Sequence, residues 1–142
     1  MHTNKCRISV KFNKNIMKKI IFTDKAPAAV GPYSQAVEVN GTLYISGQIP
    51  LNPETGKLVE GGIKEQTLQV MKNIEAILTE AGYNFTDVVK STCLLSDMKN
   101  FADMNEVYAS FYPENPPARA AFAVKELPLG VMVEIETIAV KS

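Results

Sequence analysis

Apolar residues occupy every second position through most of the segment YSQAVEVNGTLYISGQIP, residues 33–50. The alternation runs on both sides of Asn40-Gly41, through Val37, Val39, Leu43 and Ile45. Because Asn and Gly tolerate the positive φ angles of a two-residue hairpin turn, this pattern predicts a β-hairpin.

Two later segments have helical spacing instead. The first runs from Ile63 to Ala81, and Gly82 is placed to end it. Its apolar stripe comprises Leu68, Met71, Ile74, Ile77, Leu78 and Ala81. The second helix covers about Phe101 to Phe111, and the prolines that follow it stop it. Its apolar stripe comprises Phe101, Met104, Tyr108 and Phe111.

Three further strands are predicted, at DVVKSTCLL (87–95), RAAFAV (119–124) and VMVEIETIAV (131–140). The element order is then ββ-α-β-α-ββ. This order predicts an α+β sandwich in which the helices cover one face of a mixed sheet.

The last strand has an unusual open face. Val131, Val133, Ile135, Thr137 and Ala139 share one parity, and we expect the helices to cover them. The other parity mixes two carboxylates, Glu134 and Glu136, with Met132, Ile138 and Val140. A solvated face is one interpretation of this mixture. Its apolar residues favour packing against another subunit instead.

Length and charge indicate one acidic domain behind a basic leader. The chain has 142 residues, 46% hydrophobic and 21% charged, which suits a single domain over residues 18–142. Residues 1–19 hold six basic residues and no acidic one, so the remainder has a net charge of about −6. An acidic body disfavours a nucleic-acid platform, which needs a basic face.

Residues 1–17 are predicted to be a basic extension, disordered or arising from an upstream start site. The segment lacks the apolar region of a secretory signal, and Met17 opens a sequence typical of a chain start. A weak organellar presequence is the alternative. No apolar run approaches the length of a membrane span, and we expect a cytoplasmic protein.

Cysteine and histidine usage narrows the chemistry. Cys6 and Cys93 are too few for a disulfide framework or a metal cluster, and Cys93 in STCLLS is expected to be a buried, inert thiol. The one histidine, His2, lies in the leader. These residues give no basis for a histidine general base or a histidine-ligated metal.

Arginine is nearly absent, which draws attention to PPARAAFAV, residues 116–124. The chain has two arginines, Arg7 in the leader and Arg119 in this segment. A guanidinium group matches a carboxylate at two points, whereas lysine supplies a point charge. A rigid anion clamp behind Pro116-Pro117 is therefore one interpretation of Arg119, and a surface salt bridge is the other.

Four blocks follow one another along the chain: APAAVGPYSQAV, YISGQIPLNPETG, FADMNEVYASFY and PPARAAFAVKELPLGVMVEIETIAV. In this order they resemble the reactive intermediate deaminase (Rid) family of the YjgF type, and the resemblance runs from about Lys19 to Val140. It implies a chorismate-mutase-like fold, a homotrimer whose sheets face an internal barrel, and clefts between subunits. It also implies hydrolysis of 2-imino acids or their enamines, such as 2-iminobutanoate and 2-iminopropanoate, to 2-oxo acids and ammonia, without cofactor or metal.

The resemblance implies a role for each matched residue. Arg119 would clamp the substrate carboxylate and Glu134 would position or activate water. Gly47 would offer a backbone contact, while Tyr33 and Asn105 would line the cleft. Tyr33 could instead be a core aromatic residue, Gly47 could mark a bulge, and Glu136 could be an ion-pair partner.

One position departs from many members of the family, and one alternative function stays open. Ala121 stands where many members have cysteine, which excludes a thiol role there. The alternative is a trimeric 2-oxo acid-binding or regulatory module without turnover. RNA cleavage and chaperone-like behaviour have been linked to relatives, and the acidic body disfavours RNA cleavage.

Overall fold

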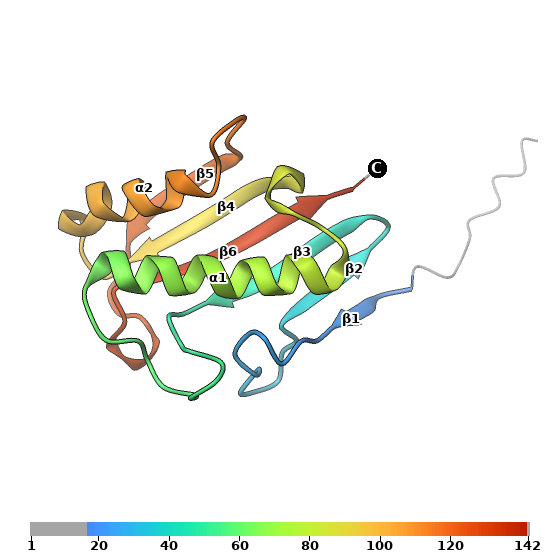
Figure 1. Ribbon diagram of the computed structural model, residues 1–142, viewed down its shortest axis with the longest axis horizontal. Coiled ribbons are helices and arrows are strands. Elements are labelled where there is room, and N and C mark those ends of the chain that lie inside the picture. Colours follow the sequence, from blue (N-terminus) through green and yellow to red (C-terminus); the bar gives the residue numbers. More distant parts are fainter. Residues whose placement is uncertain (1–16, 142) are drawn as a thin grey trace, which may run out of the picture.

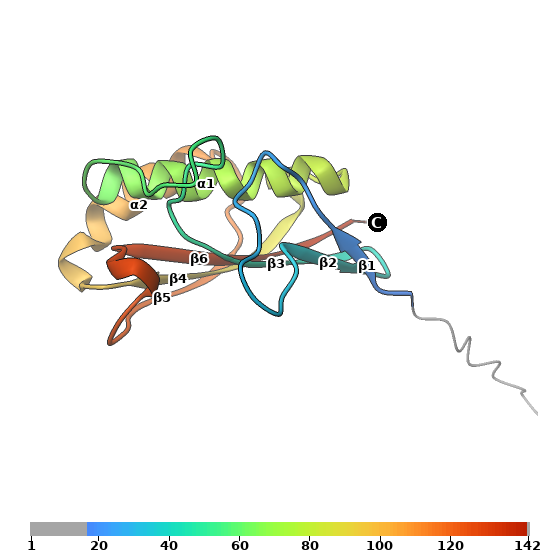
Figure 2. The same ribbon diagram turned by 90° about the horizontal axis from the view of Figure 1, so that it is seen from below.

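The computed structural model describes residues 17–141, so the prediction for the basic leader lies outside the described residues except at Met17. A single sheet carries both helices on one face (Figure 1). Figure 2 shows these two layers edge-on, with α1 and α2 above the sheet.

The sheet has six strands in the order β1-β2-β3-β6-β4-β5. The strands are β1 (Lys19–Ile21), β2 (Ala36–Val39), β3 (Thr42–Gln48), β4 (Val88–Leu95), β5 (Ala118–Ala123) and β6 (Val133–Val140). Strands β4 and β5 pair in parallel and every other pair is antiparallel, so the sheet is mixed. The helices are α1 (Ile63–Ala81) and α2 (Phe101–Ser110). Short 3-10 turns lie at Phe85–Asp87, Met98–Asn100 and Pro128–Gly130.

The α+β class and the order from β2 to β6 are confirmed, and one strand was missed. β1 is a three-residue edge strand paired with β2, too short to show an alternation. The predicted hairpin is present, with φ angles of 49° at Asn40 and 77° at Gly41 that match a two-residue turn of primed type. Gly82 ends α1 in the left-handed conformation, as expected.

The core lies between the helices and the sheet. Met71, Ile74 and Ile77 of α1 are fully buried, whereas Leu68, which has the same helical spacing in the sequence, is 40% exposed. Leu68 lies about a third of a turn around the helix from Ile74, on the side that faces solvent. Cys93 is fully buried as expected, and burial raises the pKa of its thiol to about 11, which keeps it protonated and unreactive.

The two parities of β6 separate as predicted. The helix-facing residues are all buried, namely Val131, Val133, Ile135, Thr137 and Ala139. The register across the sheet places Ile20, Tyr44, Phe122 and Val140 on the open face with Glu134 and Glu136. Those four apolar side chains are all exposed. The open face therefore presents large apolar groups beside carboxylates.

One buried amide organises the segment between β1 and β2. The side-chain oxygen of Gln35 accepts a hydrogen bond from the Thr23 amide at 2.8 Å. Its nitrogen donates to the carbonyls of Thr23, Ala26 and Pro27 at 2.9, 3.3 and 2.9 Å. The hydroxyl of Ser46 donates to the Ser34 carbonyl at 2.6 Å. Residues 23–35 are thus tied both to themselves and to β3.

No helix among residues 17–141 is long and apolar enough to cross a membrane. The same residues contain no group of three or more His, Cys, Asp or Glu side chains that could hold a metal ion.

Candidate active site

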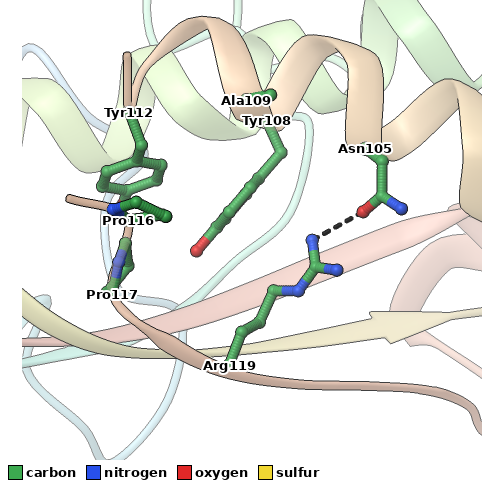
Figure 3. Close-up of a pocket in the computed structure, with 7 residues that line it drawn as sticks. All are labelled: Asn105, Tyr108, Ala109, Tyr112, Pro116, Pro117 and Arg119. Atoms are coloured by element: carbon green, nitrogen blue, oxygen red, sulfur yellow. Dashed lines mark hydrogen bonds between the residues drawn. The ribbon is translucent and has the colours of Figure 1, made fainter. Parts of the chain in front are cut away.

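Arg119 projects from the edge strand β5 into a pocket beneath α2. Its guanidinium donates a 2.6 Å hydrogen bond to the side-chain oxygen of Asn105, and Figure 3 shows the two groups facing each other. The guanidinium carbon lies 5.0 Å from the ring centroid of Tyr108 and 5.5 Å from that of Phe101. Two aromatic rings and an amide therefore hold a half-buried cation in one orientation.

The pocket around Arg119 has a volume of about 480 Å³. Its wall comprises Asn105, Tyr108, Ala109, Tyr112, Pro116, Pro117 and Arg119, all drawn in Figure 3. Within residues 17–141 the ion pairs are Lys64 with Glu106 and Lys99 with Asp97, so Arg119 pairs with no described carboxylate. The surface salt bridge considered for Arg119 is not formed there. Its remaining donors can meet an anion in the pocket.

Glu134 lies in a different pocket, at the other face of the sheet. This pocket has a volume of about 530 Å³ and is lined by Val30, Tyr33, Ser46, Gly47, Ile49, Pro128, Glu134 and Glu136. Burial is the main cause that raises the pKa of Glu134, and the nearby charge of Glu136 raises it further. A carboxylate with a raised pKa is a better proton acceptor, which suits a general base.

Gly47 allows Glu134 to approach the backbone of β3. It lies in the irregular stretch between Ile45 and Gln48, where the pairing of β3 with β6 shifts register. A Cβ atom built on Gly47 would lie 3.0 Å from Cδ and 3.2 Å from Cγ of Glu134, and closer still to Oε1. Gly47 therefore lies in a bulge of β3, and the Glu134 side chain packs closely against its backbone.

Tyr33 is not a core residue, because 54% of its surface is exposed. Its hydroxyl oxygen accepts a hydrogen bond from the Val30 amide at 3.3 Å. Glu136 is exposed and forms no ion pair with any described residue, so the ion-pair interpretation of Glu136 is not met within residues 17–141.

The expected site residues thus form two groups that the single chain keeps apart. Arg119 is the register partner of Ser91, which is buried under the helices. The Arg119 side chain therefore lies on the helix-covered face of the sheet. Glu134 is the partner of Leu94, which has the opposite parity in β4 and points to the open face. Arg119 and Asn105 form one group, and Glu134, Gly47 and Tyr33 form the other. The two pockets share no lining residue.

Comparison with known proteins places the chain in one family. The sequence model of the family described as Endoribonuclease L-PSP matches residues 23–141. The chain belongs to the endoribonuclease L-PSP family. A mouse relative named 2-iminobutanoate/2-iminopropanoate deaminase is 53% identical over 89% of this chain and 94% of its own length. The resemblance to the Rid family that the four sequence blocks indicated is thereby confirmed.

Other relatives in the endoribonuclease L-PSP family have different names. A Pyrococcus horikoshii relative described as a RutC family protein is 54% identical over 88% of this chain and 99% of its own. The crystal structure of E. coli TdcF with bound serine is 39% identical, with a TM-score of 0.83 over 87% of this chain and 99% of that one. The chain therefore has close sequence relatives in archaea and animals and shares its fold with a bacterial protein.

Several residues of the candidate site were missed from the sequence. Phe101 and Tyr108 flank the Arg119 guanidinium, although the sequence indicated them only as part of the apolar stripe of the second helix. Asn105 and Tyr108 lie three positions apart on α2 and so share one helix face, a spacing that could have linked them. Ser46 and Pro128 line the Glu134 pocket and carried no sequence signal of their own.

Replacing Gly47 tests whether close approach at β3 positions Glu134 in this family member. We expect Gly47→Ala to lower catalytic activity at least tenfold, because the new methyl group occupies the place of the carboxylate and forces it to move. Gly62→Ala is the matched control, since its Cβ would meet nothing nearer than 3.8 Å, and it should retain activity. Steady-state kinetics of both variants check this, and full activity in Gly47→Ala would contradict it.

Proposed function

We propose that this chain is a hydrolytic deaminase of 2-imino acids and their enamine tautomers, with 2-iminobutanoate and 2-iminopropanoate as substrates. Water adds to the C=N carbon and both of its protons pass in turn to the nitrogen, the first by way of Glu134, so that the C–N bond breaks to release ammonia and a 2-oxo acid. The names of relatives about half identical to this chain support the reaction. The serine bound in E. coli TdcF supports a small amino-acid-like ligand.

The proposal rests mainly on the orientation of Arg119 and on its lack of a described carboxylate partner. A half-buried guanidinium, oriented by Asn105 and two rings and unpaired with any described carboxylate, is prepared to bind a planar anion. A 2-imino acid presents such a carboxylate next to its electrophilic carbon. Charge-assisted bonds of this type are worth about 1.5–3 kcal/mol each, which fixes the substrate plane as well as its position.

Glu134 would act on the water. Its carboxylate accepts a hydrogen bond from the attacking water and takes a proton as the C–O bond forms. The raised pKa of Glu134 brings its basicity closer to that needed near neutral pH. The proposed hydrolysis uses only water, so it requires neither a metal nor an organic cofactor.

A second copy of the chain is needed to bring the two groups together. The side chains of Arg119 and Glu134 project from opposite faces of one sheet. A substrate that contacts both residue types must therefore lie between two chains. The apolar open face, with Ile20, Tyr44 and Phe122 exposed, would be covered by the neighbouring copies. We propose a closed homotrimer in which Arg119 and Asn105 of one copy face Glu134, Gly47 and Tyr33 of the next. A cytoplasmic location and a role in removing reactive metabolites remain predictions.

The assembly is tested by light scattering coupled to size-exclusion chromatography. We expect a particle of three chains at micromolar concentration. Tyr44→Glu, which puts a charge on the open face, should dissociate the trimer and abolish activity together. Leu68→Glu is the control, because Leu68 is similarly exposed but lies on α1, in the helical layer away from the open face, and it should stay trimeric. A monomeric wild-type chain would contradict the intersubunit site.

The reaction is tested with imine generated in the cuvette. A threonine dehydratase produces 2-iminobutanoate, semicarbazide traps what remains, and the chain should lower semicarbazone formation in proportion to its concentration. Acceleration of ammonia release over the buffer rate is the positive result. Tight binding of 2-oxobutanoate without any acceleration would instead support the non-catalytic 2-oxo acid-binding module.

A further inference from the structure

A second recess adjoins the Glu134 pocket on the same protomer. Its volume is about 320 Å³. Its wall comprises Pro27, Ala28, Val30, Tyr33, Gln35, Gly47, Gln48, Ile49, Leu51, Pro128 and Leu129. Five of these residues also line the Glu134 pocket, namely Val30, Tyr33, Gly47, Ile49 and Pro128. The recess is therefore continuous with the place where the reacting carbon would lie.

The wall of this recess is apolar and contains no charged side chain. Its two side-chain amides both make hydrogen bonds to the backbone. The Gln35 side chain is bonded to the backbone of Thr23, Ala26 and Pro27. The Gln48 side-chain nitrogen donates to the Ser46 carbonyl at 3.0 Å. A ligand group entering here meets chiefly carbon, with the Tyr33 ring among it.

We infer that this recess receives the substrate's side chain, and that the chain prefers 2-imino acids with apolar side chains larger than ethyl. This inference rests on the proposed function, which puts the substrate's C=N carbon beside Glu134. A dry cavity of about 150 Å³ holds a benzene molecule, so a recess of about 320 Å³ has room for an isobutyl or benzyl group. A methyl or ethyl group leaves most of that volume unfilled.

Polar side chains are disfavoured by the same wall. A side-chain carboxylate would lose its hydration and find no cation among the lining residues. In contrast, each apolar carbon that enters adds buried contact, and a single methylene can change selectivity by about tenfold or more. The recess therefore selects by size and polarity, while Arg119 binds the group that all 2-imino acids share.

Binding of stable products tests the inference without depending on turnover. Calorimetry on the full chain would compare 2-oxopropanoate, 4-methyl-2-oxopentanoate and 2-oxopentanedioate. We expect 4-methyl-2-oxopentanoate to bind at least about tenfold more tightly than 2-oxopropanoate, and the dicarboxylate to bind more weakly than either. Imines generated by an amino-acid oxidase from leucine and alanine should show the same order in kcat/KM. Equal constants for the short and branched ligands would overturn the inference.

Variants connect the preference to the recess. Ala28 is exposed, so Ala28→Phe can fill the recess without disturbing the core, and it should lower the ratio of branched to short substrate kcat/KM about tenfold. Leu129→Ala removes part of the apolar wall of the recess and should lower the same kcat/KM ratio to a smaller extent. Leu68→Ala is the matched control, an exposed leucine outside the recess, and should leave the ratio unchanged.

The outcomes separate this inference from the proposed function. If neither imine is hydrolysed and no 2-oxo acid binds, the proposed function fails and the inference fails with it. If the short imine is hydrolysed but the branched one has no advantage, only the inference fails. If Leu129→Ala changes the oligomeric state and lowers kcat/KM equally for both substrates, the recess serves subunit contact instead. That result would overturn the inference.

Discussion

An Arg119→Lys variant should fold and assemble normally and yet lose imine hydrolysis about 10- to 100-fold in kcat/KM. Lysine keeps the charge but gives up one arm of the two-point contact, which is worth about 1.5–3 kcal/mol. It also loses the stacking of the planar guanidinium beside Tyr108 and Phe101, so the remaining cation is less well oriented. Arg119→Ala, which removes the charge as well, should fall to the uncatalysed rate.

Kinetics, thermal unfolding and light scattering on the same preparations check this expectation. Lys64→Ala is the control, because it removes a basic side chain from an exposed ion pair with Glu106 and should not change activity. A folded Arg119→Lys protein with near-normal kcat/KM would show that the carboxylate is bound elsewhere.

The second large effect separates Glu134 from Glu136. Both line one pocket on one face of β6, but Glu134 is half-buried against Gly47 whereas Glu136 is exposed. Glu134→Gln keeps the shape and removes the proton acceptor, so we expect kcat to fall about 10²- to 10⁴-fold with the trimer and 2-oxobutanoate binding retained. Glu136→Gln should retain its maximal rate.

The pH dependence gives a sharper distinction between the two carboxylates. The charge of Glu136 contributes to the raised pKa of Glu134, so Glu136→Gln should lower that pKa and move the acidic limb of the rate profile to lower pH. The contribution of Glu134 to folding stability depends on pH in the opposite way from that of a carboxylate in an ion pair. Because the folded pKa of Glu134 lies above the unfolded one, its contribution is present at low pH and is lost as pH rises through the folded pKa. A rate lost in Glu136→Gln but not in Glu134→Gln would reverse the assignment.

The sequence predicted the elements better than their spatial relations. The hairpin at Asn40-Gly41 and the end of α1 at Gly82 were predictable because each depends on local backbone chemistry. The parity of β6 was predictable because one face of it is buried completely. In contrast, β1 has three residues and is defined only by its pairing with β2.

The separation of Arg119 from Glu134 within one chain could not be derived from residue patterns, although the resemblance to the Rid family implied clefts between subunits. It depends on the parallel pairing of β5 with β4 and the antiparallel pairing of β6 with β4, which fix the faces of the two side chains relative to each other. Residue spacing within one strand gives no information about register between strands that are distant in sequence. The contact of two aromatic rings with Arg119 was likewise missed, because an apolar stripe on a helix does not show which strand residue it meets.

The four hydrogen bonds of the Gln35 amide have a kinetic consequence. They hold segment 23–35, and with it Tyr33, in one conformation before any ligand arrives. A wall that is already ordered loses little backbone entropy when a ligand binds, whereas a mobile lid must first be fixed. Mixing experiments with 2-oxo acids should then show a single bimolecular phase, with an observed rate that rises linearly with ligand concentration rather than reaching a plateau set by loop closure.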